Sequence, residues 1–171
     1  MILAVDVYYK ENVAKAVSVL FNWDSKAPLE VASLYIDNVE EYTSGEFYKR
    51  ELPCILSILK QTDLSHVEAI LIDGYVYLDK DNLPGLGARL WEELGKKTPV
   101  IGVAKTAYAK NTDTVVKVSR PGSSKPLFVS AAGFDLTTAG TLVKNMAGNY
   151  RIPQILQALD KETKQNWTTE Q

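Results

Sequence analysis

Three carboxylates stand out among the residues that could do chemistry. Asp6 follows the apolar run 2–5, and Asp73 follows the apolar run 69–72. A charge at the end of such a run is costly unless it is paired or bound to a metal. One such aspartate could be an ordinary turn or helix cap, but two, on strands that one sheet could place side by side, favour a metal site. Glu51, early in a helical pattern, is the third candidate.

If these carboxylates converge in the fold, they would favour the binding of a divalent metal ion. Two unit charges ~4 Å apart repel by about 4 kcal/mol at an effective dielectric constant near 20. Without a cation, one of the acids would have to take up a proton. Mg²⁺ removes that conflict, because it prefers oxygen ligands and keeps several waters; Mn²⁺ is the alternative ion. In phosphodiester hydrolysis such an ion generates the attacking hydroxide and stabilises charge on the phosphate oxygens.

Histidine and cysteine chemistry is largely excluded. The chain has one histidine, His66, and one cysteine, Cys54. It therefore has no His-rich zinc site, no zinc finger and no internal disulfide. We interpret His66 as a core or surface residue and Cys54 as a core residue. A single cysteine agrees with a reducing compartment, so we expect a cytoplasmic protein.

The elements that must position the acids follow from hydrophobic periodicity. Alternating or continuous apolar residues predict strands over 1–8, 13–21, 29–36, 67–72, 100–104, 115–118 and 127–130. Helical spacing predicts helices over 45–60, 83–95, 136–146 and 153–164. Three early strands followed by alternating strands and helices give a mixed β-sheet flanked by α-helices, the order of a ribonuclease H-like α/β fold. We expect a single domain over 1–171, with the polar tail 165–171 frayed.

Composition and charge narrow the class further. The 171 residues are 46% hydrophobic and 23% charged, which is typical of a globular protein and excludes a coiled coil or a disordered chain. No apolar run approaches the ~20 residues that span a bilayer, and the first residues lack the basic region of a signal peptide. We expect no membrane association, and a monomer in preference to an oligomer.

The net charge of −2 gives no global attraction to nucleic acid. A local basic face could supply it. A short stretch of the chain contains five cations: Lys105, Lys110, Lys117, Arg120 and Lys125. They form either a basic face that contacts the phosphates of a nucleic-acid backbone or an ordinary solvated strand surface.

The segment 42–53, which contains Glu51 nine residues after Tyr42, resembles a signature of the endonuclease V family. Five further segments resemble that family in the same order along nearly the whole chain: 4–9, 72–74, 102–106, 125–130 and 150–153. The resemblance implies a Mg²⁺-dependent endonuclease that acts on DNA or RNA containing a deaminated base, inosine or deoxyinosine. It implies cleavage at the second phosphodiester 3′ to that base, leaving 5′-phosphate and 3′-hydroxyl ends, in nucleic-acid repair or processing.

The same resemblance assigns roles by position. Asp6, Glu51 and Asp73 become the metal-binding and catalytic carboxylates, and Lys105 becomes a catalytic residue that faces phosphate. Tyr42 belongs to the segment that separates the strands at the lesion. Substrate contacts are implied for Tyr42, Ser44, Gly45, Gly74 and Tyr75. A lesion must leave the base stack before its edge can be read, so a base pocket is expected.

The sequence departs from the family at several of these positions. Tyr75 replaces a histidine, and Ser44 replaces a proline of the strand-separating segment. The late histidine on the metal side is absent, and the segment 130–135 stands there instead. Asp135 is the candidate substitute, since a carboxylate suits Mg²⁺ at least as well as imidazole; it could equally cap the helix that begins at Leu136, and both roles are compatible.

Two alternatives to an inosine-specific nuclease follow from these departures. One is a relative that binds lesions or structured nucleic acid without cutting. The other is a metal-dependent nuclease with a different nucleic-acid substrate. Retention of three carboxylates argues against the first, because a pure binder has no use for clustered negative charge near phosphate. DNA and RNA are left undecided.

Overall fold

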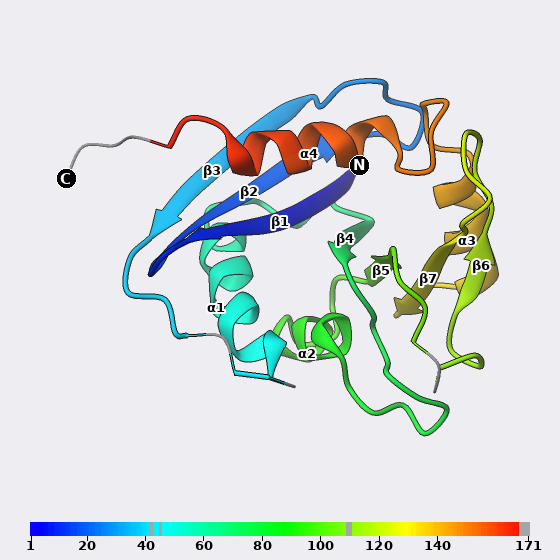
Figure 1. Ribbon diagram of the computed structural model, residues 1–171, viewed down its shortest axis with the longest axis horizontal. Coiled ribbons are helices and arrows are strands. Elements are labelled where there is room, and N and C mark those ends of the chain that lie inside the picture. The colour runs from blue at the N-terminus through cyan, green and yellow to red at the C-terminus, as the bar shows by residue number, and fades with distance from the viewer. Residues whose placement is uncertain (42, 45, 109–110, 168–171) are drawn as a thin grey trace.

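The computed structural model describes residues 1–41, 43–44, 46–108 and 111–167 and contains one mixed sheet with helices on both faces (Figure 1). Its strands are β1 (Ile2–Lys10), β2 (Val13–Phe21), β3 (Glu30–Ile36), β4 (Ala69–Asp73), β5 (Val100–Ala104), β6 (Val116–Val118) and β7 (Leu127–Ala132). Its helices are α1 (Phe47–Leu59), α2 (Leu86–Glu93), α3 (Leu136–Lys144) and α4 (Gln154–Lys164). The chain order of elements is the predicted one, and the α/β fold class is confirmed.

The strand directions decide which chain ends share an edge of the sheet. The order across the sheet is β3-β2-β1-β4-β5-β7-β6. β1, β4 and β5 are parallel to one another, whereas β7 runs antiparallel to β5. The carboxyl ends of β4 and β5 therefore meet at one edge, beside the middle of the longer strand β1. We call this the carboxylate edge because Asp6 and Asp73 lie there.

Alternation along the strands divides the core into two layers. Ala4, Leu71 and Val103 belong to the layer beneath α3 and α4. Val5 and Ile72 belong to the layer beneath α1 and α2. Apolar side chains on both faces explain why the central strands read as continuous hydrophobic runs in the sequence.

Two buried cations tie α4 and the segment before it to the rest of the fold. The Lys15 side chain, 2% exposed on β2, donates to the carbonyl oxygens of Glu162 and Gln165 at 2.7 and 2.6 Å. Arg120, 4% exposed, donates to six carbonyl oxygens between Val143 and Arg151. A positive charge at the carboxyl end of a helix is also favoured by the helix dipole.

The segment that follows α4, which we expected to fray, makes several contacts in its described part. The Trp167 indole N–H donates to the Thr163 carbonyl at 2.9 Å. The Trp167 ring makes edge contacts with the rings of Tyr8 and Tyr35, 6.2 and 5.5 Å away between centroids. Residues 165–167 thus pack against β1, β2 and β3. None of the helices in the described part of the chain is long and apolar enough to cross a membrane.

We predict that Arg120→Met lowers the free energy of unfolding by at least about 3 kcal/mol, because each hydrogen bond to a charged group contributes about 1.5–3 kcal/mol and several are lost together. Urea unfolding followed by circular dichroism measures the change. Lys117→Met is the matched control: Lys117 is exposed on β6, so its loss should change stability by no more than about 0.5 kcal/mol. Equal stability of the two variants would contradict the structural role of Arg120.

Candidate metal and nucleic-acid site

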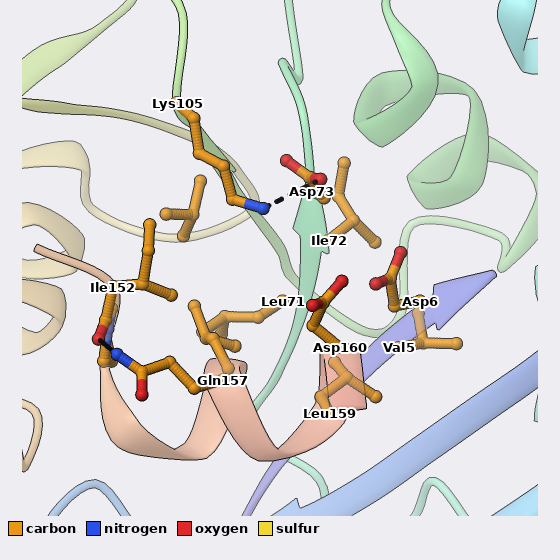
Figure 2. Close-up of a pocket in the computed structure, with 13 residues that line it drawn as sticks. Val5, Asp6, Leu71, Ile72, Asp73, Lys105, Ile152, Gln157, Leu159 and Asp160 are labelled. Carbon is orange, nitrogen blue, oxygen red and sulfur yellow. Dashed lines mark hydrogen bonds and ion pairs between the residues drawn. The ribbon is translucent and has the colours of Figure 1, made fainter. Parts of the chain in front are cut away.

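Asp6 and Asp73 are brought together by the pairing of β1 with β4. Val5 is the register partner of Ile72, so the next residues, Asp6 and Asp73, follow side by side at the carboxylate edge. Both carboxylates line one cavity on the α4 side of the sheet (Figure 2). Asp73 ends β4, whereas Asp6 lies in the middle of β1, which continues to Lys10. The pairing of the two strands nevertheless places both carboxylates in a common site.

A third carboxylate in this cavity, Asp160 of α4, was missed by the sequence analysis. Figure 2 shows it beside Asp6, facing Asp73 across the cavity. Its carboxylate also accepts from the Lys164 ammonium at 3.0 Å. The signal was available in the helical spacing: Asp160 follows Leu156 by four residues and therefore lies on the face of α4 that packs on the sheet.

Glu51 approaches the site from the opposite face of the sheet. It lies one turn before Ile55 and two turns before Ile58, so it shares the buried side of α1 with them. The residue is only 5% exposed. Within the described part of the chain its carboxylate has no hydrogen-bond or ion-pair partner.

The electrostatics show that these acids interact. Burial, followed by the charge of Asp73, raises the pKa of Asp6 to about 6, and Asp160 adds to the rise. Burial raises the pKa of Glu51 well above its usual value, and the charges of Asp6 and Asp73 raise it further. The fold therefore concentrates negative charge at the carboxylate edge, where Asp73 and Asp160 each face one lysine and, among the described residues, Asp6 and Glu51 face none within ion-pair distance.

Lys164 pairs with Asp160 within α4, and Lys105 is the cation that the fold places beside Asp73. It follows β5, and its ammonium lies 3.6 Å from the Asp73 carboxylate, with about half of each side chain exposed. An exposed pair of this kind contributes little to stability. The Lys105 side chain is thus available for an incoming anion.

The turn after Asp73 depends on two glycines. Gly74 has a φ of 129°, which other residues rarely adopt. A Cβ on Gly102 would lie 2.4 Å from the Gly74 carbonyl oxygen, so only glycine allows β5 to approach this turn. The buried Ser130 hydroxyl accepts from the Val76 N–H at 2.9 Å and holds the following residues.

Of the predicted substrate-binding residues, Gly74 and Tyr75 lie at this edge, directly after Asp73. Tyr75 follows Gly74, donates from its hydroxyl to the Thr106 carbonyl, and its ring lies 6.2 Å from that of Tyr108. Ser44 is exposed in the loop before α1. Tyr42 and Gly45 lie outside the described residues, as does Lys110 of the predicted basic face.

The prediction that Asp135 joins the metal site is wrong. β7 runs antiparallel to β5, so Ala132 pairs with Val100 at the opposite edge of the sheet, and Asp135 follows beyond it. Its carboxylate accepts from the Thr138 N–H at 2.9 Å and from the Thr138 hydroxyl, and these bonds lower its pKa. Asp135 is a helix cap.

Two further interpretations are decided by burial. His66 is exposed, which makes it a surface residue, and it precedes β4 at the end remote from Asp73. Arg120 is buried and bonded to carbonyl oxygens, so it does not belong to a phosphate-binding face.

The donor set is suited to a hard divalent cation. The acids supply only oxygen ligands, and the raised pKa values of Asp6 and Glu51 show that a nearby positive charge would relieve their repulsion. In the part of the chain that the structure describes, no three Asp, Glu, His or Cys side chains are arranged as a complete metal site. The residues fit the chemistry of such an ion, and Asp6, Asp73, Asp160 and Glu51 are the candidates to hold it.

Residues 1–121, well over half of the chain, match the endonuclease V family. The chain therefore belongs to the endonuclease V family. No curated protein sequence matches it.

Solved structures are similar over nearly the whole chain. Endonuclease V from Ciona intestinalis, in complex with a 24mer DNA containing an inosine followed by a ribo-adenosine, is 21% identical with a TM-score of 0.77, covering 95% of this chain and 83% of that one. Human endonuclease V is 18% identical with a TM-score of 0.76, covering 95% and 82%. The Bacillus subtilis protein is 21% identical with a TM-score of 0.72, covering 95% and 78%. At these identities the likeness establishes the fold.

We predict that Asp6→Asn stabilises the protein at pH 7.5 in EDTA. The folded pKa of Asp6, about 6, lies above the ordinary 3.8, so the folded state binds the proton more tightly. The Asp6 carboxyl therefore lowers the free energy of unfolding as the pH rises from about 4 to about 6, and above that range the whole destabilisation is present. A pKa raised from 3.8 to about 6 corresponds to on the order of 3 kcal/mol.

Urea unfolding at pH 7.5 and at pH 4 tests this. The gain from Asp6→Asn should shrink at the lower pH, whereas Asp24→Asn, which removes an exposed carboxylate, should change stability little at either pH. A loss of stability in Asp6→Asn at pH 7.5 would show that the Asp6 charge is compensated in the apoprotein.

Proposed function

We propose that this chain is a metal-dependent endonuclease that hydrolyses a phosphodiester 3′ to a deaminated base, inosine or deoxyinosine, in DNA or RNA. The observation that carries the proposal is the convergence of Asp6, Asp73 and Asp160 on one cavity, with Glu51 electrostatically coupled to two of them. Family membership supports nuclease activity. The inosine-containing DNA bound by the Ciona intestinalis protein supports the substrate.

The carboxylate edge is where the reaction would occur. Asp6, Asp73, Asp160 and Glu51 would hold Mg²⁺ or Mn²⁺, which when bound supplies a hydroxide nucleophile and neutralises developing charge on the phosphate. Asp6 and Asp73 on strands, with Asp160 and Glu51 on packed helices, hold their oxygens more accurately than loop residues would.

Lys105 and the turn at Gly74 complete the proposed roles. The Lys105 ammonium lies 3.6 Å from the Asp73 carboxylate. In this place it would orient a non-bridging oxygen of the phosphate. Ser44, Gly74 and Tyr75, together with Tyr42 and Gly45, contact the extruded base and the strand next to it. We assign cleavage to the second phosphodiester 3′ to the lesion, with a 5′-phosphate product.

We predict that end-labelled strands containing one inosine are cut in Mg²⁺ and left intact in EDTA. Asp73→Asn and Asp160→Asn should each lower kcat/KM at least 100-fold, because each removes a charged oxygen ligand at the reacting phosphate. Asp135→Asn is the matched control: it removes a carboxylate from the opposite edge, and asparagine still caps a helix, so activity should stay within about twofold.

Inosine and inosine-free strands, each as DNA and as RNA, are compared in the same assay. Metal-independent cutting, or full activity in both Asp73→Asn and Asp160→Asn, would overturn the proposed site. Tight binding to inosine strands with no cutting under any condition would overturn the proposed activity and identify a lesion-binding protein.

We also predict that Mg²⁺ or Mn²⁺ stabilises the folded protein. An ion present at 100 times its dissociation constant adds about 2.7 kcal/mol when only the folded state binds it. Thermal unfolding with increasing Mn²⁺ measures this, and the rise in Tm should be smaller in Asp160→Asn than in Asp135→Asn. Equal rises in these two variants would remove Asp160 from the ion site.

A further inference from the structure

The cavity at the carboxylates continues toward the start of α4. Figure 2 shows Asp6, Asp73 and Asp160 at one end and Ile152 and Gln157 at the other, with Leu71 between them. The cavity floor between the two ends is apolar. A strand whose phosphate lies at the carboxylates can therefore extend along this face toward the residues that precede Ile152.

Three loops are joined at that end by Arg151. Its guanidinium donates to the carbonyl oxygens of Lys125 and Pro126 at 3.1 and 2.9 Å, and also to the carbonyl of Lys105. The backbones at Lys105, Lys125 and Arg151 thus form one hydrogen-bonded unit. Lys105 connects this unit directly to Asp73.

The same region presents a large aromatic ring to solvent. Tyr150, next to Arg151, is 66% exposed. It packs on the turn at Gly122, where an added Cβ would lie 3.5 Å from the Tyr150 Cα and 3.6 Å from its ring carbon Cδ1. One edge of the ring therefore rests on this turn, while most of the residue is open to solvent. We call Lys125, Tyr150 and Arg151 the Tyr150 surface.

Charge in this part of the chain is strongly one-sided. Between residues 114 and 159 the sequence has five cations and one carboxylate, and that carboxylate, Asp135, lies beyond the opposite edge of the sheet. Arg151 donates to carbonyl oxygens, and among the described residues neither it nor the exposed Lys125 has a carboxylate within ion-pair distance. Their positive charges are uncompensated.

We propose that the Tyr150 surface binds the substrate strand on one side of the cleaved bond, with the Tyr150 ring stacked on an unpaired base and the Lys125 ammonium on a backbone phosphate. An exposed aromatic beside uncompensated cations is the combination that single-stranded nucleic acid requires. The inference rests on the proposed function, because it takes the carboxylate edge as the place where the strand is cut.

Binding of fluorescein-labelled 20-mer DNA strands, with and without a central inosine, tests the proposal by anisotropy in EDTA and in Ca²⁺. Tyr150→Ala should weaken binding roughly 5- to 100-fold, the range measured for loss of one stacked base. Tyr150→Phe, which keeps the ring, should bind within twofold of the unmodified chain. Unfolding midpoints of both variants establish that each is folded.

The Lys125 contact is tested through salt dependence. Lys125→Gln should reduce the slope of log Kd against log salt by about 0.7, the value for one phosphate of a single strand. Lys97→Gln is the matched control, because Lys97 is an exposed lysine just before β5, at the edge remote from the site. An unchanged slope in Lys125→Gln would overturn the phosphate contact.

Strands shortened on either the 5′ or the 3′ side of the inosine locate the contact. The penalty of Tyr150→Ala should disappear when one flank, and only one, is removed. The proposal would be overturned if Tyr150→Ala weakened binding to no strand, or if it weakened binding equally after removal of the 5′ flank and after removal of the 3′ flank. A lack of binding to any strand would also overturn it.

If inosine strands are never cut but Tyr150→Ala still weakens binding, the surface stands and the proposed activity fails. If inosine strands are cut normally and Tyr150→Ala binds them as tightly as the unmodified chain, the proposed activity stands and the Tyr150 surface fails.

Discussion

The repulsion among carboxylates at one edge of the sheet is the constraint on which the site depends. Two strands and two helices, packed from both faces, bring Asp6, Asp73, Asp160 and Glu51 toward one another. Burial first, and then this repulsion, raise the pKa values of Asp6 and Glu51. Such an arrangement lowers stability and persists only because the surrounding core holds it, which is the usual relation between a functional site and its scaffold.

The central sheet could be predicted from the sequence because its signals are local. The apolar runs that precede Asp6 and Asp73 are buried on both faces, so hydrophobicity alone marks them as strands and marks the aspartates that follow as exceptions. Glu51 was singled out by its place early in a predicted helix and by the resemblance of the segment 42–53 to the endonuclease V signature. For the two aspartates the informative feature was a charge that interrupts an apolar run.

The fourth carboxylate could not be assigned in the same way, because that assignment depends on strand direction. Asp135 follows an apolar strand just as Asp6 and Asp73 do, yet β7 runs antiparallel to β5 and delivers it to the far edge. Asp160 lies on the buried side of a short amphipathic helix, where one acidic residue resembles many solvated ones. Arg120 was likewise grouped with surface cations, since only the tertiary structure shows the carbonyl oxygens gathered around it.

Carbonyl oxygens bound by cations, rather than ion pairs, hold the elements around the site. Lys15 binds the end of α4, Arg120 binds the segment before it, and Arg151 joins its start to the loops after β5 and before β7. Because these cations are satisfied by carbonyl oxygens, they do not neutralise the acids at the carboxylate edge. The negative charge thus stays available for the metal ion of the proposed activity. One set of contacts in this way both fixes α4 and keeps these cations apart from the acids, a separation of charge that the proposed metal-dependent activity would require.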